Sequence, residues 1–213
     1  MKDAKCKICR RAGKKLFLKG EKCFLPKCPM IKKAYPPGNI KKRRRRNFSE
    51  YGKELREKQK LRNWYGLGEK QFSNYVKDVL EKTRRTSSVE QNPAEVLIKR
   101  LEIRLDNVIF RLGFAANRNQ ARQMVSHGHF LINEKRVDIP SFHLEKGDKI
   151  TIRSSSQAKE LFQKLKISLK KYEAPNWLDL DKNKLQATVI GFPTLEEVAP
   201  PAEISSIFEF YSR

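Results

Sequence analysis

Cysteine is scarce in this sequence, and none occurs after residue 28. Disulfides therefore cannot hold most of the chain together, and its folding must rest on packed apolar side chains. Long apolar runs are missing as well, since none reaches the roughly 18 residues that a membrane-spanning helix needs. The first twenty residues contain charges where a secretory signal requires an apolar centre. These absences predict a cytoplasmic protein without a membrane partner.

Acidic residues are also few. The chain has 47 Lys and Arg against 24 Asp and Glu, a formal net charge of +23. Residues 1–65 hold 23 of these cations and only 5 of the acids, a net charge of +18, so residues 66–213 carry only +5. Such a concentrated charge repels itself unless an acidic partner neutralises it, and a phosphate backbone is the commonest such partner. An anionic membrane is the alternative, but this region has no amphipathic apolar face or lipid signal.

An unbroken run of six cations follows at residues 41–46. A run of one charge cannot form a packed face, so it is either a solvated tail or an arm that lies in a groove of the partner. With the charge of its surroundings, the arm is the interpretation we favour. Its predicted nucleic-acid contacts are Lys41, Lys42, Arg43, Arg44, Arg45 and Arg46.

The four cysteines are Cys6, Cys9, Cys23 and Cys28. They form a Cys-x-x-Cys pair, thirteen intervening residues and a Cys-x-x-x-x-Cys pair, a spacing that predicts one tetrahedral Zn²⁺ site. A closed shell of four thiolates leaves no position for water or substrate, so the metal would stabilise the fold and catalyse nothing. Two disulfides or unconnected thiols are the alternative.

Helical signals begin after the basic run. Asn47 or Ser49 caps a predicted helix that ends at Gly66, and a second helix is predicted over residues 69–84. The first of these helices carries further cations that we predict to contact the nucleic-acid partner: Arg56, Lys58, Lys60 and Arg62.

A third helix is predicted to start at the Asn92 cap and to run to Gly113. Its apolar stripe is Leu97, Leu101, Leu105, Val108 and Leu112. A short fourth helix, from the Asn117 cap to Gly128, places Arg118 and Arg122 one turn apart. That pair is either a phosphate contact or part of a solvated face.

From residue 129 the apolar period changes to two, which predicts a small antiparallel sheet over residues 130–152 beside two helices. A further helix is predicted over residues 158–172. Residues 177–180 and 185–190 are predicted to form a hairpin.

Several motifs occur in order along nearly the whole chain. They are the two cysteine pairs, Tyr-Pro-Pro-Gly at 35–38, Leu-Arg-Glu-Lys-Gln-Lys-Leu-Arg at 55–62, Arg-Leu-Asp-Asn-Val-x-x-Arg-Leu-Gly-Phe at 104–114, Ala-Arg-Gln-Met-Val-Ser-His-Gly-His at 121–129, and Tyr-Ser-Arg at 211–213. In these motifs the chain resembles the family of bacterial small-subunit ribosomal protein four, in its zinc-binding, cysteine-containing type.

This resemblance implies an α+β fold with three parts. Residues 1–46 would form a zinc module with a basic extended arm. Residues 47–101 would form a mainly helical domain that is completed by residues 166–213. Residues 102–165 would form an inserted small RNA-binding domain of helices and antiparallel sheet.

The resemblance also implies a function. Members of the family are structural proteins, not enzymes, that bind small-subunit (16S-type) ribosomal RNA early and nucleate assembly of the subunit body. They lie beside small-subunit ribosomal protein five, near the channel through which messenger RNA enters, and take no small-molecule substrate. The matching positions implied to contact RNA are Arg118, Arg122, Gln123, His127, His129, Lys135 and Arg136.

Two other functions deserve comparison. An RNA-modifying enzyme that carries the same small module is the first, because Arg104-Leu105-Asp106 resembles a motif of pseudouridine synthases in which the aspartate is the nucleophile. Here Leu105 belongs to the apolar stripe and the flanks are too short for a catalytic domain, so we interpret Asp106 as structural. The second is a zinc-containing DNA-binding regulator, but the sequence has no heptad seam and no lone recognition helix after the cysteines.

Overall fold

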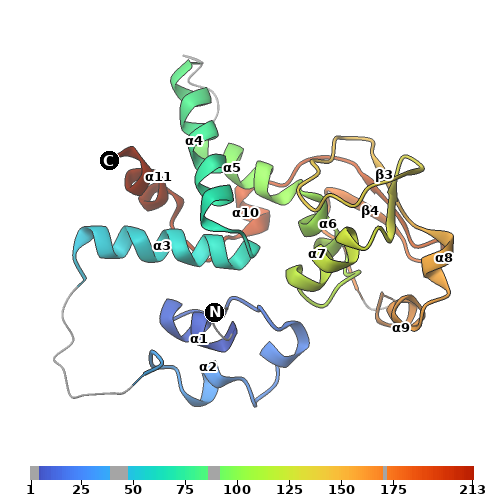
Figure 1. Cartoon of the computed structure of the whole chain (residues 1–213), viewed down its shortest axis with the longest axis horizontal. Coiled ribbons are helices and arrows are strands. Elements are labelled where there is room, and N and C mark those ends of the chain that lie inside the picture. The colour runs from blue at the N-terminus through green and yellow to red at the C-terminus, as the bar shows by residue number, and fades with distance from the viewer. Residues whose placement is uncertain (1–4, 39–47, 86–91, 170–171) are drawn as a thin grey trace. The chain divides into compact units, whose positions relative to one another are not determined.

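The computed structural model describes residues 5–38, 48–85, 92–169 and 172–213. The chain divides into two compact units, one made of residues 1–97 and 199–213, the other of residues 98–198. Figure 1 shows their elements. Within the described ranges, no helix is apolar enough over a sufficient length to cross a membrane.

The first unit is helical. Its elements are α1 (Lys5–Ala12), the 3-10 helix η1 (Gly20–Cys23), α2 (Pro29–Lys32), α3 (Glu50–Tyr65), α4 (Glu69–Arg85) and α11 (Ile204–Ser212), and α5 (Pro93–Glu102) begins in it. The hydroxyl of Ser49 accepts a hydrogen bond from the N–H of Gly52 and so starts α3. Gly66 ends α3 because its φ of 68° lies in the left-handed region. The two helices predicted here are confirmed.

The last helix, α11, packs against α3 and α4, and α1 also contacts α3. In Figure 1, α1 and α11 lie on opposite sides of α3. The fully buried core side chains of these elements are Leu61, Phe72, Val76, Val79 and Ile207. The chain end is fastened by Arg213, whose Nη2 lies 2.7 Å from Oε1 of the buried Glu54. Residues far apart in the sequence therefore form one helical core.

A second ionic contact joins α3, α4 and α11. The carboxylate of Glu69 accepts hydrogen bonds from Lys58 at 2.5 Å, from Arg62 at 2.6 Å and from the hydroxyl of Tyr211 at 3.1 Å. Burial alone would raise the pKa of Glu69, but the bonds from Lys58 and Arg62 outweigh it and lower that pKa below 4.5. Burial and the neighbouring Glu69 carboxylate raise the pKa of Tyr211.

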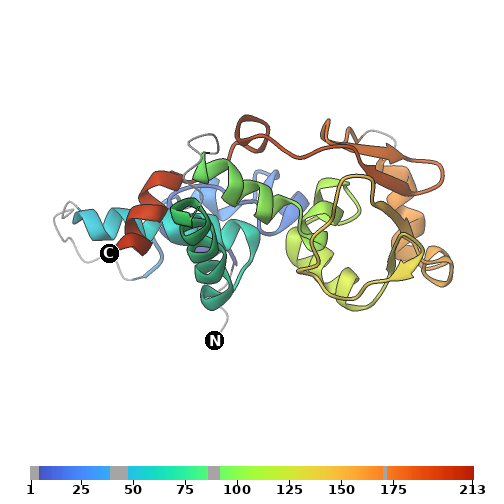
Figure 2. The ribbon, with the colours of Figure 1, turned by 90° about the horizontal axis from the view of Figure 1, so that it is seen from above.

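The second unit combines helices with a sheet. It contains the end of α5, then α6 (Leu105–Arg111), α7 (Arg118–Ser126), β1 (Phe130–Ile132), β2 (Lys135–Arg136), β3 (Lys149–Ile152), α8 (Ser154–Gln157), α9 (Glu160–Leu169), β4 (Leu178–Asp181), β5 (Gln186–Val189) and α10 (Leu195–Val198). The strands form one antiparallel sheet in the order β2-β1-β3-β5-β4. Figure 2 shows this unit from above, with the β4–β5 hairpin that forms one edge of the sheet.

The hairpin was predicted, but its location differs from the predicted domain division. Lys149 of β3 pairs with Thr188 of β5, and Ala187 and Val189 are buried in the same core as β1 and β3. Residues 166–198 therefore belong to the second unit, and only residues 199–213 complete the helical one. The sheet of the small domain is extended in this way by two strands, β5 and β4, which enlarge its apolar face.

The predicted third helix is interrupted, which corrects the expectation of one helix up to Gly113. The N–H groups of Leu105 and Asp106 donate to the carbonyls of Phe142 and Pro140, at 2.8 and 3.1 Å, instead of to carbonyls one helical turn earlier. Arg104 forms an isolated β-bridge with His143 at the same place. The apolar stripe stays buried on both sides of the break, at Leu97 and Leu101 before it and at Leu105, Val108 and Leu112 after it.

Glu69→Gln should destabilise the first unit at neutral pH. A carboxylate whose pKa is lowered by folding stabilises the fold above its unfolded pKa, and that contribution is lost as the pH falls through the folded pKa. The gap in Tm between the two proteins should thus be widest above pH 4.5 and close at lower pH. Glu209→Gln, on the exposed face of α11, is the control and should leave Tm unchanged. A gap that stays constant with pH would contradict this role of Glu69.

Candidate nucleic-acid interface and cysteine cluster

An exposed polar edge of the second unit is formed by α7 and β2. Arg122, Gln123 and His127 are exposed at the end of α7, and Lys135 and Arg136 are exposed on β2. The two elements meet at Gly128, which the guanidinium of Arg136 approaches so closely that a Cβ at this position would clash with it. Gly128 also has a φ of 66°, which favours glycine. Five of the seven positions implied by the resemblance therefore lie on this edge, where phosphate can reach them.

His129 lies next to this edge but is half-buried. Its Nδ1 forms a hydrogen bond of 2.9 Å with Oγ of Ser156, and its ring packs edge-on against Phe162. Burial lowers the pKa of His129, and the nearby charges of Lys159, His127 and Arg153 lower it further. The imidazole is therefore a neutral hydrogen-bonding group at neutral pH, within a positively charged surrounding. Arg153 and Lys159 are not among the predicted contacts, because their charge is the only signal that they have in the sequence.

Arg118 corrects the prediction of an exposed arginine pair on α7. Its Nε donates a 2.7 Å hydrogen bond to Oδ1 of Asn107, and its guanidinium lies 4.6 Å from the centre of the Phe110 ring. Its Nη2 is 4.0 Å from the carboxylate of Glu102, which is fully buried and also accepts two 2.8 Å hydrogen bonds from Arg111. The side chain of Arg118 is only 10% exposed, and these contacts join α7 to α6 and to the end of α5.

Asp106 has a structural partner. Its two carboxylate oxygens accept hydrogen bonds from Nε and Nη2 of Arg104, at 3.1 and 2.7 Å, and both residues are buried. A bidentate pair of this kind fixes the carboxylate and withholds it from solvent. This arrangement agrees with the structural interpretation of Asp106 and disfavours a nucleophile at this position.

The cations of α3 divide into two groups. Lys58 is buried, pairs with Glu69 and lies 4.4 Å from the centre of the Phe210 ring, which corrects its prediction as a surface contact. Arg56, Lys60 and Arg62 are half-buried and line one groove of the first unit. The predicted arm at residues 41–46 lies outside the residues that the structure describes.

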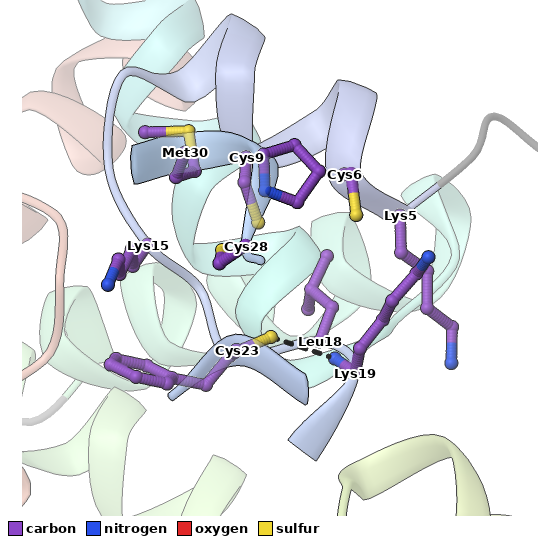
Figure 3. A pocket seen from close by; sticks show the side chains of 11 residues that line it. Lys5, Cys6, Cys9, Lys15, Leu18, Lys19, Cys23, Cys28 and Met30 are labelled. Atoms are coloured by element: carbon purple, nitrogen blue, oxygen red, sulfur yellow. Dashed lines mark hydrogen bonds between the residues drawn. The ribbon is translucent and has the colours of Figure 1, made fainter. Parts of the chain in front are cut away.

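The four cysteines come from three elements and line one pocket. Cys6 and Cys9 lie on α1, Cys23 ends η1, and Cys28 precedes α2. Figure 3 shows their side chains around this pocket, with the N–H of Lys19 donating to Sγ of Cys23 at 3.4 Å. All four are free thiols, so the alternative of two disulfides is not what the structure contains.

The donor set suits a soft metal ion, although no ion-holding arrangement is formed. Among the described residues, no three His, Cys, Asp or Glu side chains are close enough to hold a metal ion. Burial raises the pKa of Cys9, a backbone hydrogen bond with Leu16 lowers it, and the other three thiols raise it by repulsion. A cation in the pocket would offset that repulsion. The N–H of Lys19, which donates to Sγ of Cys23, is the kind of hydrogen bond that supports a metal ligand. The residues thus fit zinc chemically.

These features together define a class. The chain is strongly basic and has an exposed polar edge on a helix-and-sheet unit, while Asp106 and Glu102 are buried in pairs with Arg104 and Arg111. This is the class of proteins that bind a folded nucleic acid and act as structural components.

Comparison with known proteins gives the family. The profile for the Ribosomal protein S4/S9 N-terminal domain matches residues 1–101, and that for the S4 domain matches residues 103–150. The small ribosomal subunit protein uS4 of Natranaerobius thermophilus is 44% identical over 208 residues, which cover 98% of this chain and 96% of that protein. Those of Syntrophomonas wolfei and Thermus thermophilus are 44% identical over 211 residues (99% and 98% covered) and 43% identical over 208 (98% and 96%). This chain belongs to the small ribosomal subunit protein uS4 family.

Arg118 and Arg122 should respond differently to the same substitution. Arg118→Gln removes a hydrogen bond and an ionic contact inside the second unit, so we expect a loss of about 1–3 kcal/mol in its unfolding free energy. Arg122→Gln changes an exposed side chain, so we expect a change within about 0.5 kcal/mol. Denaturant unfolding measures both. Equal unfolding free energies of the two variants would show that the contacts of Arg118 do not stabilise the second unit.

Proposed function

We propose that this chain is a primary binder of small-subunit ribosomal RNA that attaches early and nucleates assembly of the subunit body. As a member of the uS4 family, it is a structural, RNA-binding component of the small ribosomal subunit, in the cytoplasm, and not an enzyme. The observation that carries the proposal is the similarity over 98% of the chain to proteins named small ribosomal subunit protein uS4.

The form of the second unit supports recognition by shape. An A-form RNA helix has a deep, narrow major groove that side chains cannot read, so a folded RNA is bound through its phosphates, 2′-hydroxyls and outline. Arg122, Lys135 and Arg136 are exposed cations held by regular structure, which suits a fixed pattern of phosphates. Gln123 adds a neutral side chain that can donate to or accept from a 2′-hydroxyl.

We also propose the position of the chain within the subunit. Its neighbours would be small-subunit ribosomal protein five and, at the channel through which it enters, messenger RNA. The support for these neighbours is the resemblance of the motifs at 55–62, 104–114 and 121–129 to the family. The arm at residues 41–46 would add contacts with ribosomal RNA through its six cations.

One structural zinc ion is the proposed cofactor. Cys6, Cys9, Cys23 and Cys28 would hold it as thiolates, since a thiolate and not a thiol is the ligand. When bound, the ion supplies only a closed, stabilising shell. The support is the pair spacing, the shared pocket and the reduced state of all four residues.

Salt should weaken the RNA complex strongly. Each neutralised phosphate releases a counterion, so binding of a small-subunit RNA fragment should lose about 10³-fold in affinity or more between 50 and 200 mM salt. A titration by filter binding measures the slope, with duplex DNA of equal length as competitor. A slope near zero, or equal competition by DNA, would contradict the electrostatic and shape-based account.

Zinc removal should loosen only the cysteine module. We expect about one zinc per chain in protein purified without chelator, and none in Cys9→Ser. Chelation should expose residues 5–38 to protease while residues 98–153 stay protected, because the two regions have separate cores. Uniform proteolysis, or a chain free of metal that resists protease as well as the native protein, would refute a local structural role.

A further inference from the structure

A groove in the first unit runs between α1 and α3. It has a volume of about 450 Å³. Its lining residues are Ile8, Arg11 and Ala12 from α1, and Arg56, Gln59, Lys60, Arg62 and Asn63 from α3. Arg11, Gln59 and Asn63 are not among the predicted contacts, because nothing in their spacing indicates that α1 and α3 pack together.

The lining of this groove is suited to an anion. Four of its side chains are cationic, two are amides, and none is a carboxylate. Glu57 and Glu69 pair with Lys60 and Arg62, but neither acid lines the groove. Among the described residues, the buried Nε of Arg62 has no hydrogen-bond acceptor. Cations gathered around a hollow repel one another, and an anion within it relieves that repulsion.

The two walls of the groove are connected. Nη2 of Arg56 donates a 3.2 Å hydrogen bond to the main-chain oxygen of Arg11. The helix that supplies Arg11 also carries Cys6 and Cys9, whose side chains are turned to the cysteine pocket (Figure 3). The position of this wall therefore depends on how the cysteine module is folded.

We propose that the groove between α1 and α3 binds the phosphodiester backbone of the ribosomal RNA, and that the cysteine cluster controls this contact by holding α1 in place. The inference rests on the proposed function, which it deepens by naming a binding site and its regulation. A chain whose cysteine module has lost its fold would keep the RNA contacts of the second unit and lose those of the groove.

Gln59→Glu tests the site in the full-length protein. Gln59 is exposed, so the change adds a negative charge to the groove without removing a packed side chain. We expect about a tenfold loss of affinity for the small-subunit RNA fragment, and a reduction of the salt slope by about one. The control is Asn74→Asp, which adds the same charge at an exposed site of α4 outside the groove and should cost less than twofold. Equal effects of the two variants would overturn the groove as a site.

Cys9→Ser tests the control by the cysteine cluster. In this background α1 should no longer close the groove, so adding Gln59→Glu should weaken binding by less than about twofold instead of tenfold. Circular dichroism and the protease resistance of residues 98–153 verify that the second unit remains folded. Independent, additive losses would overturn the coupling and leave the groove as a fixed site.

Two further results distinguish a failure of the proposed function from a failure of the groove as an RNA contact. If the native protein fails to bind small-subunit RNA at all, the proposed function itself is wrong. If it binds RNA with the same affinity with and without Gln59→Glu, while inorganic pyrophosphate protects only the native protein against thermal unfolding, the groove holds a small phosphate compound and the RNA contact is refuted.

Discussion

Ion pairs between a few carboxylates and arginine or lysine side chains join the helices of both units, and the rest of the structure depends on how few acids the chain has. Glu69 joins three helices of the first unit through Lys58, Arg62 and Tyr211. Glu102 joins α5, α6 and α7 of the second. Glu102 is fully buried, and since breaking a buried pair costs about 3–5 kcal/mol, this acid is needed where it is.

The consequence is an excess of cations that the protein cannot neutralise itself. With 24 acids against 47 basic residues, a net charge of +23 would remain even if every acid were paired with a cation. Arginine thus has two roles that the sequence does not distinguish. Arg118 is turned inward to Glu102 and Asn107, while Arg122, one turn later, is exposed. A polyanion such as ribosomal RNA completes the charge balance, which is why a chain of this composition is a structural component of the small ribosomal subunit.

Local signals allowed much of the fold to be predicted. The caps at Ser49 and Asn117 and the stop at Gly66 are short-range chemistry, and the structure has all three. Long-range contacts escaped prediction. The apolar stripe from Leu97 to Leu112 is buried as expected, but one helix and two consecutive helices satisfy the same periodicity, and the break depends on residues 140–144.

In the candidate site too, local sequence predicts some positions, while others depend on residues far away in the chain. Exposed positions such as Lys135 and Arg136 agree with their sequence pattern, since their strand has no buried face. The burial of Lys58 and Arg118 depends on carboxylates 11 and 16 residues away, and the groove of Arg11 and Arg56 depends on packing between segments 45 residues apart. The pairing of β5 with β3, which moves residues 166–198 into the second unit, is likewise a tertiary choice.

Chemical probing of small-subunit ribosomal RNA, with and without the native protein, tests the central claim most directly. If a rigid cationic surface reads the shape of a folded RNA, protection should be confined to one compact junction of helices and should vanish when that junction is unfolded by removal of magnesium. Protection scattered along the RNA regardless of its fold, or no protection at all, would contradict the account.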